Sequence, residues 1–341
     1  MGGLGFDTGV LVGWVRSELA EAAPFDWLCV GVTDPSTGLV TMVQDCTPIG
    51  PPEVYLAAEL FVPDVNKIAW LAEQPVPVGV LSEATGGDLE SSYRYRNALR
   101  PSGIGHELRA ALVVDGRCWG YMVLLRKPER PDFSGDEVRA VAAAVPRLAG
   151  RLRDRLLRAT AAGAGTGPGG HGYAVVAEDG SLEGANDRAA EVFARISAQH
   201  PAVQLDLPVP VAVMVAALQA PGAPETRRAL VSVADAGWLV LEAGRVPCGD
   251  GGSRVVVSIE PARPVLLAPL LLQAAGLTER EIEVARCVLY GMTNAEIADR
   301  LGISPYTVQD HLKAAFAKTG TRSRRELANE ILPGTHFADI P

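Results

Sequence analysis

The sequence predicts an α+β chain in which two sheet-containing units are followed by a unit of four short helices. Two observations predict the sheets: β-prone runs flank turn signals at 27–43 and at 106–126, and further β-prone runs occur within 172–262. A third observation predicts the helical unit, because the stretch 277–332 carries four helix-start signals in close succession. Strands followed by helices are typical of an α+β fold or of separate domains.

The composition is that of a globular protein. A chain of 341 residues is long enough for two or three domains, and 48% hydrophobic with 21% charged residues excludes global disorder. The formal net charge of −9 argues against a protein that is coated with nucleic acid. Any contact with DNA is therefore expected from a local basic surface.

The cysteines are few and scattered, without a CxxC pair or a neighbouring histidine cluster: Cys29, Cys46, Cys118, Cys248 and Cys287. This pattern predicts neither a zinc site nor a disulfide framework, and it favours a reducing, cytoplasmic location. The N-terminal sequence MGGLGFDTG has no targeting signal, and no apolar stretch is long enough for a bilayer. We therefore expect no membrane partner.

Residues 1–160 are predicted to form the first unit, a sheet with helices on one face. Its two hairpins turn at Asp34–Gly38, a longer loop, and at Asp115-Gly116, a type I′ signal. Helical and loop-rich sequence fills 51–100, and a capping box opens a closing helix at about 135–160.

The end of that closing helix, RLRDRLLRAT, leaves two interpretations open. Its leucines recur near heptad spacing with arginines between them: Leu148, Leu152, Leu156 and Leu157. One interpretation is a closing helix with a solvated basic face, and the other is a signalling helix that forms a dimer. Pro146 removes a backbone hydrogen bond and is expected to kink the helix.

Residues 171–263 are predicted to form a second sheet unit, joined to the first by the Gly-rich linker 161–170. Its strands enclose a helix that begins near Asn186 and an ambiguous middle at 201–225, which is rich in proline and alanine. The apolar segment 264–276 connects this unit to the last one. We expect it to pack against a neighbour rather than to enter a membrane.

Four helix-start signals stand close together in the last unit. Three have the capping-box spacing, in which a hydroxyl residue precedes a glutamate by three positions: Thr278, Thr293 and Ser323. The fourth is Ser304, before a proline that suits the first helical position because it lacks an N–H group. Glycines follow where C-terminal caps require positive φ: Gly291, Gly302 and Gly320.

These signals predict helices at 279–290, 294–301, 305–319 and 324–332. The second and third are joined by a turn of about three residues, which is the helix-turn-helix arrangement. With LTEREIEV, EIADRLGIS, TVQDHLKAAFAKTG and SRREL, residues 277–333 resemble the DNA-binding domain of LuxR-type transcription regulators. The resemblance implies a sequence-specific regulator that binds double-stranded DNA.

The first two units resemble sensor folds. ELRAALVVDGRCWGYMVLLR followed by FSGDEVRAVAAAVPRLAGRL is similar to a GAF domain, and the second unit resembles a degenerate PAS-like domain. These resemblances imply signal sensing, with an unknown small-molecule ligand in the GAF-like unit. His106, before a strand, is the candidate contact for that ligand, and its alternative is a histidine at a loop edge.

The third helix is expected to bury an apolar stripe at helical spacing: Val308, Leu312, Ala315, Phe316 and Thr319. The N-terminal half of the opposite face enters the major groove in helix-turn-helix docking. The resemblance assigns base reading to Gln309, Asp310 and Lys313, which suit adenine, cytosine N4 and guanine respectively. Asp310 has an alternative role, because it can pair with Lys313 three residues on.

Contacts to the DNA backbone are predicted around this face. The residues that suit phosphate oxygens are Thr293, Asn294, Ser304, Tyr306, Thr307, Lys318, Arg322, Arg324 and Arg325. From 303 to 325, five basic residues stand against one acidic residue, a local charge of +4 in a chain of −9. A local cluster of positive charge of this kind is expected on a DNA-binding surface.

The remaining predictions concern partners and chemistry. The resemblance implies a homodimer through the last helix, with Leu327, Ile331 and Leu332 as contacts, although core packing competes for the same side chains. The histidines are scattered, and neither HExxH, GxSxG nor a phosphate loop occurs, so we expect no enzyme, metal or cofactor. The alternative is a sensor or scaffold protein whose helical unit binds another protein, such as RNA polymerase.

Overall fold

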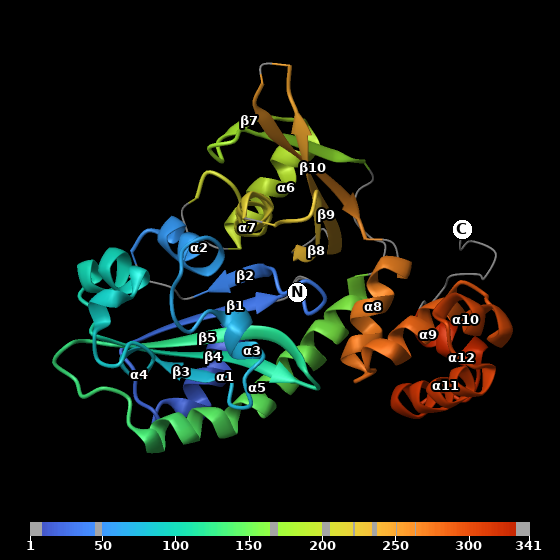
Figure 1. Cartoon of the computed structure of the whole chain (residues 1–341), viewed down its shortest axis with the longest axis horizontal. Coiled ribbons are helices and arrows are strands. Elements are labelled where there is room, and N and C mark those ends of the chain that lie inside the picture. Colours follow the sequence, from blue (N-terminus) through green and yellow to red (C-terminus); the bar gives the residue numbers. More distant parts are fainter. Residues whose placement is uncertain are drawn as a thin grey trace.

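The chain folds into two antiparallel sheets with their helices and a separate helical unit, so the α+β class is confirmed. The computed structural model describes residues 9–44, 50–163, 170–199, 205–220, 222–233, 237–249, 251–262 and 264–331. In Figure 1 the first sheet lies at lower left, the second sheet above it, and the helical unit at right.

The first sheet has the strand order β2-β1-β5-β4-β3. Its strands are β1 (Trp27–Thr33), β2 (Val40–Gln44), β3 (Val78–Val80), β4 (His106–Val114) and β5 (Arg117–Arg126). Both predicted hairpins are present, β1–β2 and β4–β5. Asp115 and Gly116 have φ of 53° and 72°, the positive values that a type I′ turn requires.

Helices cover both faces of this sheet, so the prediction of helices on one face is wrong. One face carries α1 (Gly9–Leu19) and α5 (Gly135–Gly163). The other carries the chain between β2 and β4: α2 (Pro52–Leu60), α3 (Ile68–Ala72), α4 (Leu81–Ala84) and the short turns η1 (Leu89–Ser91), η2 (Tyr95–Leu99) and η3 (Arg100–Ser102). Because side chains alternate along a strand, β4 sends Leu108 and Ala110 into one core and Ala111 into the other.

The leucines of α5 belong to the core of the chain. Leu148 and Leu152 are fully buried, and Leu156 is 3% exposed, against the first sheet and α1. The helix continues through Pro146 and ends three residues beyond the predicted 160. The closing-helix interpretation therefore fits, because these leucines are not free to contact a second copy.

The second sheet has the strand order β7-β6-β10-β9-β8. Its elements are β6 (Gly172–Val176), β7 (Leu182–Ala185), α6 (Asp187–Ala198), α7 (Val209–Gln219), β8 (Thr226–Val233), β9 (Gly237–Pro247) and β10 (Ser253–Pro261). Asn186 caps α6 as predicted, since its side-chain oxygen accepts from the Ala189 N–H at 2.9 Å. Both α6 and α7 pack on one face of this sheet.

The ambiguous middle of the second unit contains α7, which lies between the two sheets (Figure 1). It contacts β8 and β9 on one side and β2 and α2 of the first unit on the other. A helix that is covered on several sides has no polar face, so PVPVAVMVAALQ shows no helical periodicity.

One cysteine departs from the prediction that the chain has no disulfide. Cys29, on β1, is disulfide-bonded. Cys118, Cys248 and Cys287 are free thiols among the residues that the structure describes. Scattered spacing in the sequence therefore did not indicate whether a cysteine is paired.

The last part of the chain consists of five helices. These are α8 (Pro264–Ala274), α9 (Glu279–Leu289), α10 (Asn294–Leu301), α11 (Pro305–Thr319) and α12 (Arg324–Ile331). The bounds of α9 to α12 agree with the predicted helices to within a residue. We call residues 277–331 the helical unit. In the described part of the chain, no helix is long and apolar enough to cross a membrane.

The predicted caps define these helices. Full capping boxes are present at Thr278 and Thr293, and the Ser304 hydroxyl accepts from the Thr307 N–H at 3.0 Å. The box predicted at Ser323 is only half formed. Its hydroxyl accepts from the Glu326 N–H, but the Glu326 carboxylate accepts from the Arg322 N–H instead of the Ser323 N–H.

Glu281 makes the stability of the helical unit depend on pH. Burial would raise the pKa of Glu281, but hydrogen bonds from Lys318 and the Thr278 N–H outweigh this effect and lower the pKa below the ordinary 4.5. A carboxylate with a lowered folded-state pKa stabilises the fold above its unfolded pKa, and this contribution disappears as the pH falls through the folded value.

We therefore expect Glu281→Gln to destabilise the protein at pH 7 by about 1–3 kcal/mol. The difference from the wild type should shrink as the pH falls below about 4.5. Thermal unfolding of both proteins at a series of pH values measures this difference. A difference that stays constant down to about pH 3 would contradict the assignment.

Candidate functional site

The exposed face of α11 is the candidate site. Gly302, with φ 63°, ends α10, and Ser304 caps α11 two residues later. On the inner side Val308 and Ala315 are fully buried and Leu312 is 5% exposed, so the predicted apolar stripe packs into the helical unit. This packing determines which side chains of α11 point outward.

The residues predicted to read bases lie together on the outer face. Gln309, Asp310 and Lys313 are all exposed, one helical turn apart at most. In the described part of the chain no hydrogen bond or ion pair joins Asp310 to Lys313, so the alternative pairing is not formed. Tyr306, at the start of the same helix, is 74% exposed.

Three of the predicted phosphate contacts are bound within the fold. Lys318 Nζ lies 2.7 Å from Glu281 Oε2, which ties α11 to α9. Arg324 donates to the Met292 carbonyl and to the Asn294 side chain, which ties α12 to the turn before α10. The structure therefore gives Lys318, Asn294 and Arg324 positioning roles that their sequence context did not indicate.

The other predicted phosphate contacts divide into two groups. The hydroxyls of Thr293, Ser304 and Thr307 take part in helix caps: Thr293 bonds Glu296, and Ser304 Oγ lies 2.8 Å from Thr307 Oγ1. Arg322 and Arg325 are exposed, and within the described residues their side chains have no hydrogen-bond or ion-pair partner. With Lys313, they are the free cations beside the exposed face of α11.

Two of the three residues predicted as dimer contacts are core residues. Leu327 is fully buried and Ile331 is 4% exposed, inside the core that α8, α9 and α12 share. Leu332 lies outside the described residues. Leu327 and Ile331 thus take the competing role that the sequence left open for them, which is packing in the core.

The helix α8 belongs to two hydrophobic cores at once. Ala268 and Leu272 are fully buried in the core of the helical unit. Leu267 and Leu270, at 1% and 2% exposure, belong to the core that contains α5, Leu230 and Trp238. The expected packing of 264–276 against a neighbour is thus confirmed, with neighbours on both sides.

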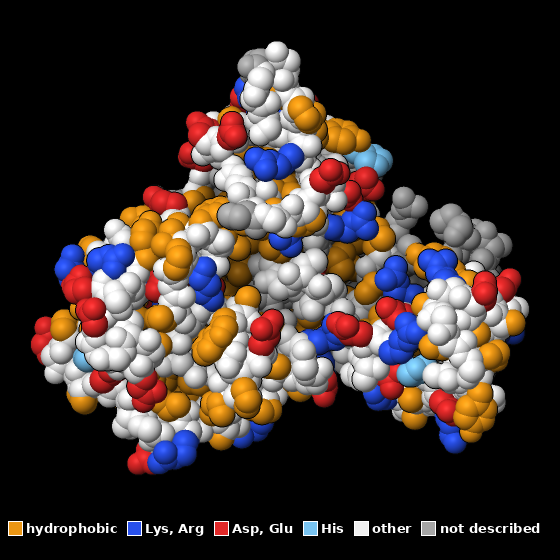
Figure 2. Space-filling model, in the orientation of Figure 1, with side chains coloured by type: hydrophobic (Ala, Val, Ile, Leu, Met, Phe, Trp, Pro, Cys, Tyr) orange, Lys and Arg blue, Asp and Glu red, His pale blue; other side chains and the backbone are white. Residues whose placement is uncertain are grey.

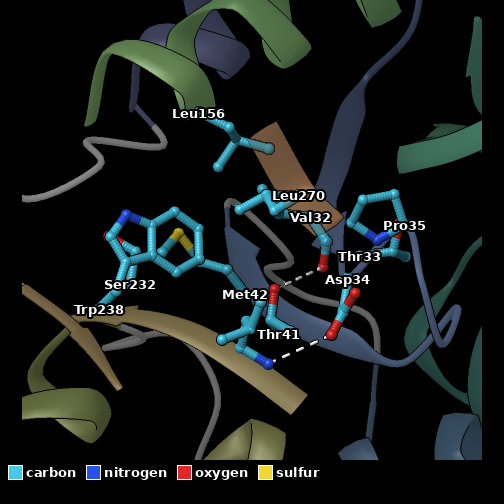
Figure 3. A pocket seen from close by; sticks show the side chains of 11 residues that line it. Val32, Thr33, Asp34, Pro35, Thr41, Met42, Leu156, Ser232, Trp238 and Leu270 are labelled. Carbon is cyan, nitrogen blue, oxygen red and sulfur yellow. Dashed lines mark hydrogen bonds between the residues drawn. The ribbon is translucent and has the colours of Figure 1, made fainter. Parts of the chain in front are cut away.

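A junction forms where the β1–β2 hairpin, β8–β9, α5 and α8 meet (Figure 3). Asp34, 5% exposed, accepts from the Leu230 N–H at 3.2 Å and from the Ser36 N–H at 2.8 Å. The side chain of Gln273, on α8, donates to Ser36 Oγ at 3.1 Å. The first sheet thus holds both the second sheet and α8 by polar bonds.

Only a small space remains inside this junction. Val32, Met42, Trp238 and Leu270 line it, and its volume is ≈ 10 Å³, which is room for about one water molecule. Burial raises the pKa of Asp34, even though hydrogen bonds from Ser36 and Leu230 oppose this effect. The sequence indicated Asp34 only as a turn residue, and Gln273 carried no signal.

His106 lies opposite Arg126 in the sheet, on the other face from Glu107 and Arg109. It stands at the start of β4 on the α5 side, because strand alternation places it on the face of Leu108. Its Nδ1 is 3.4 Å from Asp132 Oδ1, and its buried Nε2 has no hydrogen-bond partner among the described residues.

On the face shown in Figure 2, basic and acidic side chains are mixed over the two sheet units. Among the described residues, no group of three or more His, Cys, Asp or Glu side chains is placed to hold a metal ion.

The helical unit matches known proteins. Residues 275–331 match the family model described as bacterial regulatory proteins, luxR family. An HTH-type transcriptional regulator of Mycobacterium bovis is 48% identical over 55 residues, which is 16% of this chain and 6% of that protein. The spore germination protein GerE of Bacillus subtilis is 39% identical over 56 residues, which is 16% of this chain and 76% of GerE.

A solved structure matches over a longer range but with little similarity. The structure of SdiA in complex with octanoyl-rac-glycerol is 13% identical, covers 95% of this chain and 86% of SdiA, and has a TM-score of 0.31. That score is too low for the two folds to be compared. The similarity to known proteins therefore rests on the helical unit.

Proposed function

This chain belongs to the LuxR family of bacterial regulatory proteins, and we propose that it regulates transcription by binding double-stranded DNA through the exposed face of α11. The observation that carries the proposal is the placement of Gln309, Asp310 and Lys313. All three are exposed on one face of a helix whose other face is buried in the helical unit. A helix supported in this way can enter a major groove without losing its own packing.

Each of the three side chains suits a different base edge. The Gln309 amide offers a donor and an acceptor, as adenine N7 and N6 require. Lys313 can donate to guanine O6 and N7, and the Asp310 carboxylate can accept from cytosine N4. Because Asp310 is unpaired in the described part of the chain, a cytosine amine would be a partner for it.

Phosphate contacts are assigned to the free cations and the cap region. Arg322 and Arg325 follow α11, and Tyr306 stands at its start, so the three flank the base-reading residues. None of these side chains has a partner elsewhere in the described residues. We assign Lys318 and Arg324 to holding the helices in place, because their charges are already engaged.

Lys313→Ala and Gln309→Ala should each reduce the preference for the specific site by about 1–3 kcal/mol, while non-specific binding changes little. Gel-shift titrations of the full chain against its selected site and a scrambled site measure this preference. The site is first obtained by selection from a random DNA library.

Arg325→Ala is the matched control. It should weaken binding to all sequences alike and reduce the salt slope by about 0.9, because one phosphate contact is lost. If site preference survives both Lys313→Ala and Gln309→Ala, another surface reads the DNA. If the wild-type chain does not bind DNA but does bind RNA polymerase, the alternative function is favoured.

We also propose that the chain binds DNA as a homodimer at paired half-sites, since one recognition helix reads only a few base pairs. Leu327 and Ile331 are unavailable for the contact in this arrangement. Exposed residues of α12, namely Asn329 and Glu330, remain open to a second copy. The mass of the protein–DNA complex by light scattering tests this, and one chain per site would contradict it.

Control of DNA binding is proposed to come from the two sheet units, 1–160 and 171–263, acting as GAF-like and PAS-like sensors. The route is α8, which lies within the segment 264–276 and shares a core with both sheets and with the helical unit. A change in the sheets that moves α8 also moves the surface on which α9 and α12 pack. The bond between Gln273 and Ser36 holds α8 to the first sheet.

Ser36→Ala should therefore alter DNA affinity from a distance. It removes the partner of Gln273, which is 5% exposed, and should destabilise the junction by about 1–3 kcal/mol. We expect the affinity for the specific site to change severalfold, measured by fluorescence anisotropy. The control Ser17→Ala removes an exposed hydroxyl on α1, far from α8 in the chain. An affinity that is unchanged in Ser36→Ala would rule out this route.

A further inference from the structure

We propose that the aromatic ring of Tyr306 reads a thymine, by packing against the C5-methyl group that this base presents in the major groove. The inference rests on the proposed function, because it concerns the face of α11 that is assigned to DNA. It adds a fourth base contact to those of Gln309, Asp310 and Lys313, and it names the base. The Tyr306 hydroxyl keeps the phosphate contact assigned to it, so the new contact belongs to the ring.

Tyr306 points in the same direction as the residues already assigned to bases. An α-helix turns by about 100° per residue, so Lys313 lies only about 20° from Tyr306 around the helix axis. Asp310 lies about 40° to one side of Tyr306, and Gln309 lies about 60° to the other side. Tyr306 is therefore near the middle of the outer face. Because the phosphate strands run along the margins of a groove, the middle of this face points at the base edges.

The buried side of α11 faces the opposite way. Its most buried residues, at 0% to 5% exposure, lie about 120–180° from Tyr306 around the axis: Val308, Leu312 and Ala315. Pro305, at the first position of the helix, fixes the backbone just before Tyr306. The Tyr306 ring therefore cannot fold back into the helical unit, and the packing of α11 sets the direction in which it points.

The fold makes no use of the Tyr306 ring. The ring is 74% exposed, more than any other exposed large hydrophobic side chain of the described residues, and Val76 follows at 53%. Tyr173, at 51%, is stacked on His171, whereas Tyr306 has no ring contact, hydrogen bond or ion pair within the described part of the chain. Covering an exposed aromatic ring is favourable, so the ring is available to a partner.

Thymine is the base that suits this ring. In the major groove each base presents its own set of groups, and only thymine presents a methyl group. The Tyr306 ring is apolar except for the hydroxyl at its tip, so it has no polar atoms with which to read the donors and acceptors of other bases. An apolar side chain against the thymine methyl is a recognised form of base readout.

The position of Tyr306 along α11 indicates where the thymine lies. At 1.5 Å per residue, Tyr306 is about 6 Å from Asp310 and about 10 Å from Lys313 along the helix axis. Base pairs are stacked about 3.4 Å apart. The thymine is therefore expected about two base pairs from the base read by Asp310, on the side away from the base read by Lys313.

The test uses the full-length chain and the DNA site that is selected from a random library. Each thymine of the site is replaced in turn by deoxyuridine, which lacks only the methyl group, and Kd is measured by fluorescence anisotropy. We expect one thymine in each half-site at which this change weakens wild-type binding about fourfold, because the burial of about one methyl group is lost. A selected site without thymine at that place would overturn the proposal.

Two variants separate the ring from the hydroxyl. Tyr306→Ala should bind the thymine site and the deoxyuridine site equally, because the ring is absent. Tyr306→Phe should keep the preference for thymine while it binds both sites more weakly, because only the hydroxyl is removed. Since the side chain is 74% exposed, we expect the melting temperature of both variants to equal that of the wild type.

Arg325→Ala is the matched control, because it removes a phosphate contact beside the same face. It should weaken binding to both sites alike and keep the preference for thymine. A preference that survives in Tyr306→Ala would overturn the proposal, since another residue would then contact the methyl group. Loss of the preference in Tyr306→Phe would also overturn it, because the hydroxyl would then be the reading group.

Failure of this inference is distinct from failure of the proposed function. If the wild type does not distinguish thymine from deoxyuridine, but Gln309→Ala and Lys313→Ala still reduce site preference, α11 reads DNA without the Tyr306 ring. Only the present inference is then overturned. A wild-type chain that binds no DNA would overturn both.

Discussion

The arrangement of the chain depends on α8, a helix whose sequence PVLLAPLLLQA is apolar around its whole circumference. Such a helix is stable only when several sides are covered, and here one side is buried with α5 and β8–β9 and another with α9 and α12. Leu270 and Leu272, two residues apart, lie in different cores and are 2% and 0% exposed. The helical unit is therefore held against the sheets by hydrophobic burial and not only by a covalent linker.

Within the helical unit, charges serve two separate purposes. Glu281 caps α9 and binds Lys318 of α11, and Arg324 joins α12 to the turn before α10. These bonds fix the angle at which α11 is presented. The unengaged cations beside the exposed face of α11, Lys313, Arg322 and Arg325, are a small part of a chain whose net charge is −9. In the function proposed here, affinity for DNA comes from one local surface and should fall steeply with salt.

The sequence predicted best what depends on neighbours along the chain. The caps at Thr278, Thr293 and Ser304, and the turn at Asp115-Gly116, are local signals, and the helices and the hairpin followed from them. Features that depend on tertiary packing were not predicted from the sequence. A second helical layer on the first sheet and the buried helix α7 follow from which surfaces meet. Arg324 and Arg325 are adjacent in sequence, but Arg324 is hydrogen-bonded within the fold and Arg325 is exposed. The difference arises because Met292 and Asn294 lie beside Arg324.

Hydrogen exchange of the full chain with Leu270→Ala tests most directly whether α8 couples the sheets to the helical unit. Leu270 is buried only in the core of the sheets, so its loss leaves the contacts inside the helical unit intact. Our account predicts faster exchange in α9 and α12 as well as in α5 and β8–β9, whereas Leu218→Ala in α7 should leave α9 and α12 unchanged. Faster exchange confined to α5, α8 and β8–β9 would contradict it.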